Sequence, residues 1–540
     1  MELSLHGIET QNEWKAKGFR MPKYDIASMR RCTRENPEWI HFGAGNIFRA
    51  FLAVAQQKLL NAGKAKTGII VRAPSDKEMI ERVYAPHDNL FIVSTLQKDV
   101  IENEVVASVA ESLAPADIER LIEVFKSPSL QMATFTVTEK AYSVTDAAGE
   151  ILPHIADDMA AAPERATSFM GLVTRLCFER FKAGRFPLAL VSMDNCAENG
   201  AKLKQIVCAI AEAWREGGFV PAQFTEYLNS EHIAFPYTMI DKITPQPAQD
   251  VAEHLAALGC EGLEILKTSK NTNIAPFVNT EKPEYLVIED SFPNGRPPLE
   301  DAKFIFSDRE TVNNAEKMKV GACLNPLHSV LAVFGCLLDY KFIYEAMNDS
   351  ALVELISQIS YQESLPHVPD PGIINPKAFL RQVIEERFPN PFIPDTPQRI
   401  AADTSQKIPV RYGKALKKMT GDEMETLVGF PFFFAGWLRY LLGINDSGKT
   451  FAPSPDPMLD DLCATLEGIE LGASGPFVEK LRPILSNRGI FGVDLFESGI
   501  ANKTERFFAR MVAGPGAVRK TLDECFMQII DQKGESQCLI

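Results

Sequence analysis

The chain has 540 residues, which is enough for about two to four domains of ordinary size. Hydrophobic residues make up 46% and charged residues 24% of the sequence, as in a soluble globular protein, and the formal net charge of −15 argues against nucleic acid as the main partner. The ten cysteines form no CxxC pair and the eight histidines form no HxH or HExxH pattern, so we expect free thiols and no metal site.

No targeting or membrane segment is expected. The N-terminus has neither the basic stretch nor the apolar stretch of a signal peptide. The longest apolar run, 430–443, is interrupted by Arg439 and is too short to cross a bilayer, so it predicts a buried helix. These features predict a cytoplasmic protein with neither membrane nor nucleic acid among its partners. The sequence does not decide between a monomer and a small homo-oligomer.

The first structural unit is predicted after a polar lead-in at residues 1–36. A short buried strand at 39–42 runs into a glycine turn, and a helix is predicted over 50–62. Strand, glycine turn and helix form the first unit of a dinucleotide-binding fold. Gly43 would allow the tight turn and Gly45 the approach of a pyrophosphate, although Phe48 stands where the third glycine of the fingerprint belongs. The residues expected to bind the cofactor are Gly43, Gly45, Asn46, Phe48 and Arg49.

Further short apolar runs alternate with helical patterns along the N-terminal half. This alternation favours an α/β fold with a parallel sheet, in which ligands gather at the carboxyl ends of the strands. Asp194 and Asn195 fall at one such end. The predicted strands are at 67–71, 90–94, 105–109, 132–137 and 188–193.

The end of the second strand bears on the choice of cofactor. An acidic residue there would bond an NAD ribose, whereas basic and hydroxyl side chains could accommodate the phosphate of NADP. Arg72 and Ser75 lie at that end, and Asp76 follows a little later. We expect NAD, and these residues leave NADP open.

The pattern changes after about residue 200. A long helix is predicted over 201–217, and the segment SFPNGRPPL at 291–299 is a connection rich in proline and glycine. From about residue 301 onward the periodicity is mostly helical. We therefore expect a lead-in at 1–36, a Rossmann-type domain at 37–299 and a mostly α-helical domain at 300–540.

Residues 319–329 (KVGACLNPLHS) place a lysine, an asparagine and a histidine a few residues apart in an apolar run. A lysine beside such a segment is a candidate for a lowered pKa, and the asparagine and histidine would need hydrogen-bond partners or a ligand. The alternative interpretation is a core helix whose polar groups are satisfied within the protein.

Seven stretches of the chain carry a resemblance to a known family. They are GAGNIFRA at 43–50, VTEKAY at 137–142, SMDNCAENG at 192–200, FPYTMIDKITP at 235–245, YLVIEDSFPNGRPP at 285–298, KMKVGACLNPLHS at 317–329 and PNPFIPDTPQRIAADTSQKIPVR at 389–411. In their order and number they resemble the long-chain polyol and sugar-acid dehydrogenases, the family of mannitol 2-dehydrogenase, fructuronate reductase and tagaturonate reductase.

The resemblance implies a metal-independent, nicotinamide-dependent oxidoreductase with an N-terminal Rossmann-type domain, a mostly helical C-terminal domain, and the substrate between them. In this family a lysine acts as general acid/base and two asparagines hold the reacting oxygen. Such groups suit ketone reduction, because amide donors stabilise the developing negative charge and a lysine can protonate it. The matching catalytic residues are Lys319, Asn195, Asn325 and His328, and the matching substrate contacts are Arg399, Lys407 and Asp241.

The lysine departs from the family pattern. In the family it precedes the asparagine by five positions, but Val320 occupies that place here and Lys319 is one position further back. On an α-helix one extra residue is a rotation of about 100°. Either a local bulge restores the geometry, or Lys317 or Lys319 has a changed role. Pro326 also departs from the pattern, and it favours a helix start at this point.

The leading functional hypothesis is interconversion of a keto sugar acid and its aldonate, D-fructuronate and D-mannonate. The basic residues Arg399, Lys407 and Arg411 suit a carboxylate on the substrate. The alternatives are mannitol 2-dehydrogenase or tagaturonate reductase activity. A further alternative, motivated by the shifted lysine, is a sugar-acid epimerase that retains its NAD.

Overall fold

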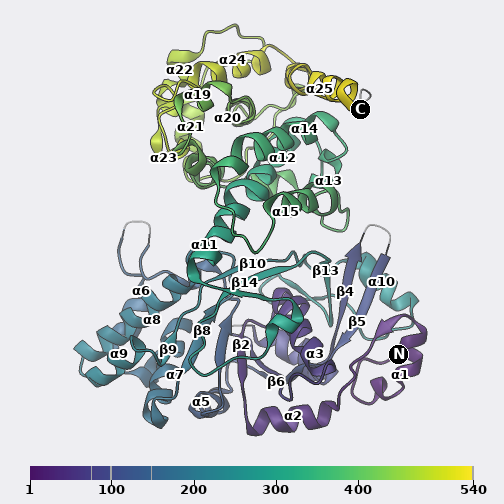
Figure 1. Cartoon of the computed structure of the whole chain (residues 1–540), viewed down its shortest axis with the longest axis vertical. Coiled ribbons are helices and arrows are strands. Elements are labelled where there is room, and N and C mark those ends of the chain that lie inside the picture. The colour runs from purple at the N-terminus through teal and green to yellow at the C-terminus, as the bar shows by residue number, and fades with distance from the viewer. Residues whose placement is uncertain (75, 98–99, 147–148, 538–540) are drawn as a thin grey trace. The chain divides into compact units, whose positions relative to one another are not determined.

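The computed structural model describes residues 1–74, 76–97, 100–146 and 149–537. The chain divides into two compact units, Met1–Asn313 and Asn314–Ile540 (Figure 1). The first unit contains the sheets, and the second is built from helices. The chain therefore has the predicted α/β class, with a Rossmann-type N-terminal part and a mostly α-helical C-terminal part.

A six-stranded parallel sheet forms the centre of the first unit. Its strand order is β6-β3-β2-β7-β8-β9. Of the strands in this sheet, the first in chain order, β2, lies beside the fourth, β7, so the strand order reverses between them, as it does in a dinucleotide-binding sheet. The strands are β2 (Trp39–Phe42), β3 (Ile69–Arg72), β6 (Val109–Leu113), β7 (Met132–Phe135), β8 (Leu188–Ser192) and β9 (Ile233–Ala234).

Alternating side chains of this sheet enter two separate cores. In β2, Trp39 faces one core and Ile40 the other, and in β3 Val71 and Ile70 divide in the same way. This follows from the two-residue period of a strand buried on both faces. The first core is closed by η2 (Phe48–Ala53) and α3 (Val54–Asn61). Helices on the second core are α5 (Ile118–Lys126), α7 (Phe169–Gly184), α8 (Asn199–Glu216) and α9 (Ala222–Leu228).

Two of the predicted strands belong to a different sheet. The runs at 90–94 and 105–109 correspond to β4 (Phe91–Gln97) and to the end of β5 (Val100–Val106), which pair antiparallel. With β1 (Phe19–Arg20) and β13 (Phe277–Glu281) they form a separate four-stranded sheet. Their place in one parallel sheet was therefore a wrong expectation, because apolar runs of this length do not reveal their pairing partner.

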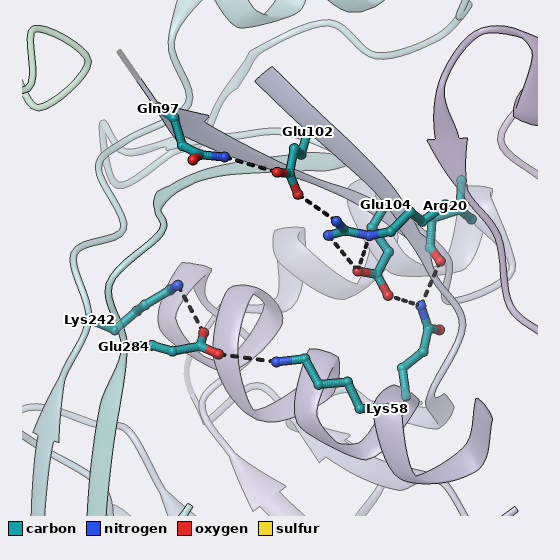
Figure 2. A network of polar contacts seen from close by, with 9 residues as sticks. Arg20, Lys58, Gln97, Glu102, Glu104, Lys242 and Glu284 are labelled. Carbon is teal, nitrogen blue, oxygen red and sulfur yellow. Dashed lines mark hydrogen bonds and ion pairs between the residues drawn. The ribbon is translucent and has the colours of Figure 1, made fainter. Parts of the chain in front are cut away.

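A network of polar contacts ties α3 to two of the smaller sheets of this unit, β1-β5-β4-β13 and β10-β14-β15 (Figure 2). Lys58 of α3 donates to Glu284 at 3.1 Å. Glu284 precedes β14 (Tyr285–Glu289), and it also accepts from Lys242 at 3.0 Å. Gln57, also on α3, donates to Glu104 of β5 at 2.8 Å. The helical segment that follows the glycine turn ends in α3, so these contacts hold in place the helix that leads away from the turn.

The second unit is organised around two buried helices, α12 (Asn325–Leu337) and α20 (Gly429–Leu441). The predicted buried helix at 430–443 is thus present as α20. It packs against α12 and α24 (Ala501–Val512), while α14 (Ser350–Ser357) packs on α25 (Ala517–Gln537).

One helical stretch, Arg309–Leu337, is long and apolar enough to cross a membrane by length and composition alone. In that stretch, 72% of the most apolar window is buried inside the structure. Such burial is typical of a core helix in a soluble protein.

Candidate active site

The glycine turn after β2 forms the floor of a cavity. Gly43 has a φ of 122°, which disfavours other residues, and a Cβ on it would lie 2.3 Å from the Thr136 carbonyl oxygen. Gly45 has no atom within 4 Å of the corresponding position, so its backbone faces open space. The turn therefore provides a site where a ligand can approach the main chain.

This cavity has a volume of about 470 Å³ and lies at the carboxyl ends of β2, β3 and β7. It therefore includes the point where the strand order reverses, where dinucleotides bind in such sheets. Its open glycine floor and its position fit a nicotinamide dinucleotide. Lining residues include Gly43, Gly45, Arg72, Asp76, Thr136, Thr138 and Ser168.

The other expected cofactor residues lie away from this cavity. Phe48 is fully buried and stacks on His41 with 4.4 Å between ring centroids. Arg49 is also fully buried; its guanidinium donates to the carbonyl of Ala275 at 2.7 Å and to Asn46 at 2.8 Å. These contacts hold the helix start rather than a ligand. The sequence could not indicate this, because the turn is followed by the π-helix η2, which sets the direction of these side chains.

A basic side chain, Arg72, and an acidic side chain, Asp76, both line the cavity near the end of β3. The first kind suits the phosphate of NADP and the second suits the ribose of NAD. Arg72 is buried there and donates to the Pro115 carbonyl at 3.2 Å, while its Nε and Nη1 atoms have no partner among the described residues. Burial lowers the pKa of Arg72, and the Asp117 charge opposes this. Asp76 is half-buried and caps α4 (Lys77–Met79). Ser75 lies outside the described residues.

The loop after β8 is tied to the cavity wall by Asp194. Its carboxylate accepts hydrogen bonds from the backbone N–H groups of Val137 at 2.9 Å and Thr138 at 3.1 Å, and from the Tyr142 hydroxyl at 2.6 Å. Thr138 has a φ of 84°, a conformation that costs about 1–3 kcal/mol and persists only when its surroundings hold it. Asn195, the next residue after Asp194, is exposed.

Asp241 is the last residue of β10 (Thr238–Asp241) and is buried. It is followed by Lys242, whose ammonium is held by Glu284. Burial lowers the pKa of Lys242, and the Glu284 charge opposes that shift.

In the second unit, the extra residue of the lysine segment lies in a π-turn. The helix is π over Lys319–Cys323, and the Leu324 N–H donates to the Lys319 carbonyl at 3.1 Å, five residues back. This is the local bulge that was one of the two expected explanations. Lys319 is buried with 1% of its surface exposed, whereas Lys317 is exposed.

A new helix, α12, begins directly after this turn. Leu324 breaks the helical geometry with φ −131° and ψ −63°, and Asn325 and Pro326 form the first turn of α12, as the proline predicted. Arg411 donates to the Asn325 carbonyl at 3.0 Å and to the Ser329 hydroxyl, and Tyr412 donates to the Pro326 carbonyl at 2.6 Å. These two residues fix the position of the first turn.

His328 and Arg399 share one acidic partner, Asp395. The His328 Nε2 atom lies 3.4 Å from the Asp395 carboxylate, and Arg399 forms an ion pair with the same carboxylate. Burial lowers the pKa of His328, and Asp395 opposes this shift. Burial alone would raise the pKa of Asp395, but His328 and Arg399 outweigh it and hold that pKa below its usual value.

Lys407 is a half-buried cation in the same charged cluster. It donates to the carbonyls of Ile400 at 2.9 Å and Ala402 at 2.5 Å. Its pKa is lowered to about 8 by burial and by the positive charges of Arg411 and Arg399, with Asp403 and Asp456 opposing. The structure thus brings Asn325, His328, Arg399 and Lys407 into one region of the second unit.

Sequence reasoning missed several residues that hold these groups. Asp395 could have been suspected from its position four residues before Arg399, a spacing at which opposite charges can pair near a helix start. Asp194 was expected at the carboxyl end of a strand, but its hydrogen bonds to Val137, Thr138 and Tyr142 were not, because these residues lie more than 50 positions away in the sequence. Among the described residues there is no group of three or more His, Cys, Asp or Glu side chains that could hold a metal ion.

Comparison with known proteins agrees with this architecture. Residues 37–301 match the family model of the mannitol dehydrogenase Rossmann domain, and residues 311–506 match that of the mannitol dehydrogenase C-terminal domain. The D-mannonate oxidoreductase of Thermotoga maritima is 48% identical over 97% of this chain and 99% of its own length. A mannitol 2-dehydrogenase of Cereibacter sphaeroides is 31% identical over 81% of this chain and 86% of its own.

Among solved structures, the mannitol 2-dehydrogenase of Pseudomonas fluorescens, determined with NAD and D-mannitol, is 25% identical. It matches with a TM-score of 0.72 and covers 97% of this chain and 99% of its own. These similarities span both units. The chain is an oxidoreductase, and it belongs to the mannitol dehydrogenase family.

Proposed function

We propose that this enzyme interconverts D-fructuronate and D-mannonate with NAD. The proposed substrate rests on the 48% identity to the Thermotoga maritima D-mannonate oxidoreductase, which extends over nearly the full length of both chains. The cluster of Arg399, Lys407 and Arg411 supports a substrate with a carboxylate, because guanidinium and ammonium groups form charge-assisted hydrogen bonds to it.

Lys319 acts in this proposal as the general acid/base. Its side chain is buried, with 1% of the residue's surface exposed, so the protein encloses the amine as a general acid/base that works on a bound substrate requires. Lys317 is exposed and lacks that environment. The π-turn supports the assignment, because it accommodates the one extra residue that separates Lys319 from Asn325 compared with the family spacing.

Two amides are the proposed donors to the reacting oxygen. Asn325 is held at the start of α12 by Arg411 and the neighbouring Tyr412, and Asn195 follows the anchored Asp194. Preorganised donors of this kind stabilise negative charge without reorganising during the reaction. His328 stays neutral because burial lowers its pKa. Its one N–H, on Nε2, faces the Asp395 carboxylate, so its Nδ1 atom can accept one hydrogen bond from a substrate hydroxyl. Arg399, Lys407 and Asp241 are the proposed further contacts to the sugar acid.

When bound, the nicotinamide cofactor supplies or accepts the hydride. Gly43 and Gly45 would hold its pyrophosphate, because the glycine floor leaves room for a ligand at the backbone. Asp76, which lines the cavity after β3, supports NAD through a hydrogen bond to the ribose. Binding measured for NADH and NADPH in parallel tests this preference, and tighter binding of NADPH would contradict it.

Turnover of hexuronates tests the substrate. We expect NADH consumption with D-fructuronate and NAD reduction with D-mannonate, and weaker activity with fructose, mannitol or tagaturonate. Turnover of fructose or mannitol without turnover of any hexuronate would refute the carboxylate proposal. Interconversion of two sugar acids with no net change in NADH would instead identify an epimerase.

The lysine assignment has a matched pair of variants. Lys319→Met should reduce kcat by about 10²–10⁴-fold, the usual contribution of a general acid/base. Lys317→Met removes an exposed lysine two residues away and should leave kcat within about threefold of wild type. The opposite result would identify Lys317 as the base.

A further inference from the structure

A relay of buried polar groups crosses from β2 to β7 beneath the glycine turn. Trp39 Nε1 donates to the Thr134 hydroxyl at 2.8 Å. The Thr134 hydroxyl lies 2.6 Å from His41 Nδ1, and His41 Nε2 lies 2.9 Å from the Thr136 hydroxyl. Trp39, His41 and Thr134 are each fully buried. None of these groups has a role in the proposed chemistry.

The relay decides which nitrogen of His41 carries the proton. The imidazole is neutral, because burial lowers the pKa of His41 to about 3 despite a backbone hydrogen bond to Gly43. One ring nitrogen therefore donates and the other accepts. If Nδ1 donated, the Thr134 oxygen would accept two hydrogen bonds, and its own buried proton would have no acceptor among the described residues.

The other tautomer satisfies every buried group. Thr134 accepts from Trp39 and donates to His41 Nδ1, and the Nε2–H of His41 then donates to the Thr136 oxygen. A buried donor left unsatisfied is costly, so the network favours this arrangement. In it the Thr136 oxygen is already an acceptor, and the Thr136 proton is left for another partner.

Thr136 lies where that proton can reach a ligand. It lines the cavity, and its hydroxyl oxygen would be only 2.5 Å from a Cβ placed on Gly43. The hydroxyl is therefore next to the backbone where a dinucleotide pyrophosphate approaches. Its backbone N–H donates to the Phe42 carbonyl at 2.9 Å, which holds the residue in place.

We infer that the Thr136 hydroxyl is a hydrogen-bond donor to the pyrophosphate of the cofactor, oriented by the relay from Trp39 through Thr134 and His41. This inference rests on the nicotinamide dinucleotide cofactor proposed above. This gives the buried His41 a role in the strand. As a neutral group it fixes the direction of the Thr136 hydroxyl without placing a charge beside the cofactor phosphates.

Binding of phosphate-bearing and phosphate-free probes tests the inference. Calorimetry on the full chain should show that Thr136→Val weakens binding of ADP by about 10-fold to 100-fold, the value of a hydrogen bond to a charged oxygen. Binding of adenosine, which lacks phosphates, should change by less than about threefold. Thr136→Ser keeps the hydroxyl and should restore ADP binding to near the wild-type level.

The outcomes separate the inference from the cofactor proposal. Equal loss of ADP and adenosine binding in Thr136→Val would show a general change of the cavity and would overturn the role of the hydroxyl. Unchanged ADP binding would overturn it as well. If the wild-type chain bound neither ADP nor NADH, the cofactor proposal itself would fail.

The tautomer can be observed independently of binding. In the full chain labelled with ¹⁵N-histidine, the His41 ring signals are identified by their loss in His41→Asn. We expect the spectrum of a neutral imidazole with the proton on Nε2. A proton on Nδ1 would overturn the relay, because the Thr136 hydroxyl would then donate to His41 rather than to the cofactor.

Discussion

Deleting Val320 tests whether the π-turn keeps Lys319 in its functional position. Val320 is half-buried in the π segment, which lies between α11 (Arg309–Met318) and α12. Its removal leaves Lys319 five positions before the asparagine, the spacing expected of the family. The bond from the Leu324 N–H to the Lys319 carbonyl then closes an ordinary α-helical turn.

The magnitude follows from helix geometry. In an α-helix one residue corresponds to about 100° of rotation and 1.5 Å of rise. The π-turn holds one more residue than an α-turn between the same two helices, so the deletion should remove the bulge and leave both helices in phase. We expect kcat to stay within about tenfold of wild type, well above the loss of about 10²–10⁴-fold for a missing general acid/base.

Inserting one alanine after Val320 is the matched control. The segment already holds its extra residue, so the insertion should rotate Lys319 by about 100° relative to α12. We expect kcat to fall by about 10²-fold or more while NADH binding, which depends on the first unit, is retained. The assay is steady-state NADH oxidation with D-fructuronate, alongside circular dichroism to verify folding.

Two results would refute the reasoning. If the folded deletion variant lost activity as completely as Lys319→Met, the π-turn would be required in itself rather than as compensation for an extra residue. If the insertion variant kept wild-type kcat, the position of Lys319 relative to α12 would not matter for the reaction.

Three further predictions concern the charged groups. Glu284→Gln should lower the free energy of unfolding by about 3 kcal/mol, because Lys242 has only 3% of its side chain exposed and loses its ion-pair partner. Urea unfolding measures this, and a loss below about 1 kcal/mol would contradict it. Asp395→Asn should lower the pKa of His328 further, because Asp395 is the group that raises it, and the acid limb of kcat/KM should move to lower pH; an unmoved limb would contradict this. For hexuronates, kcat/KM should fall as pH rises through about 8, where Lys407 loses its charge. Lys407→Arg should abolish that fall. A pH profile unaltered by the substitution would exclude Lys407 as a charged partner of the substrate carboxylate.

The sequence predicted the first Rossmann unit because its signals are local. The strand 39–42, the glycine turn and the following helix each depend on neighbouring residues, and the structure has β2, the turn and η2–α3 there. The direction in which the side chains after the glycines point does not depend on neighbouring residues alone. Phe48 enters the core against His41, and the sequence pattern gave no sign of a π-helix that begins at that residue.

The lysine segment shows how far a spacing argument can reach. Counting residues revealed one more than the family pattern allows, and helix geometry left a bulge or a changed role as explanations. The π-turn at Lys319–Cys323 confirms the bulge. Burial of Lys319 could not be read from the count, because a count of residues does not give the direction of a side chain, and only the packed helix shows which lysine is enclosed.

The charged cluster of the second unit favours an anionic substrate over a neutral polyol. The chain carries a net charge of −15, yet Arg399, Lys407 and Arg411 influence one another closely enough to lower the pKa of Lys407, after burial, to about 8. Placing like charges together in a partly buried region is unfavourable unless an opposite charge joins them. Asp395 compensates Arg399, and Asp403 and Asp456 offset part of the charge on Lys407. Arg411, however, is bonded to neutral partners, and the Lys407 ammonium itself is bonded to backbone carbonyls. A bound carboxylate would relieve this repulsion, whereas the hydroxyl groups of mannitol would leave it in place, and so the cluster is better explained by a sugar acid.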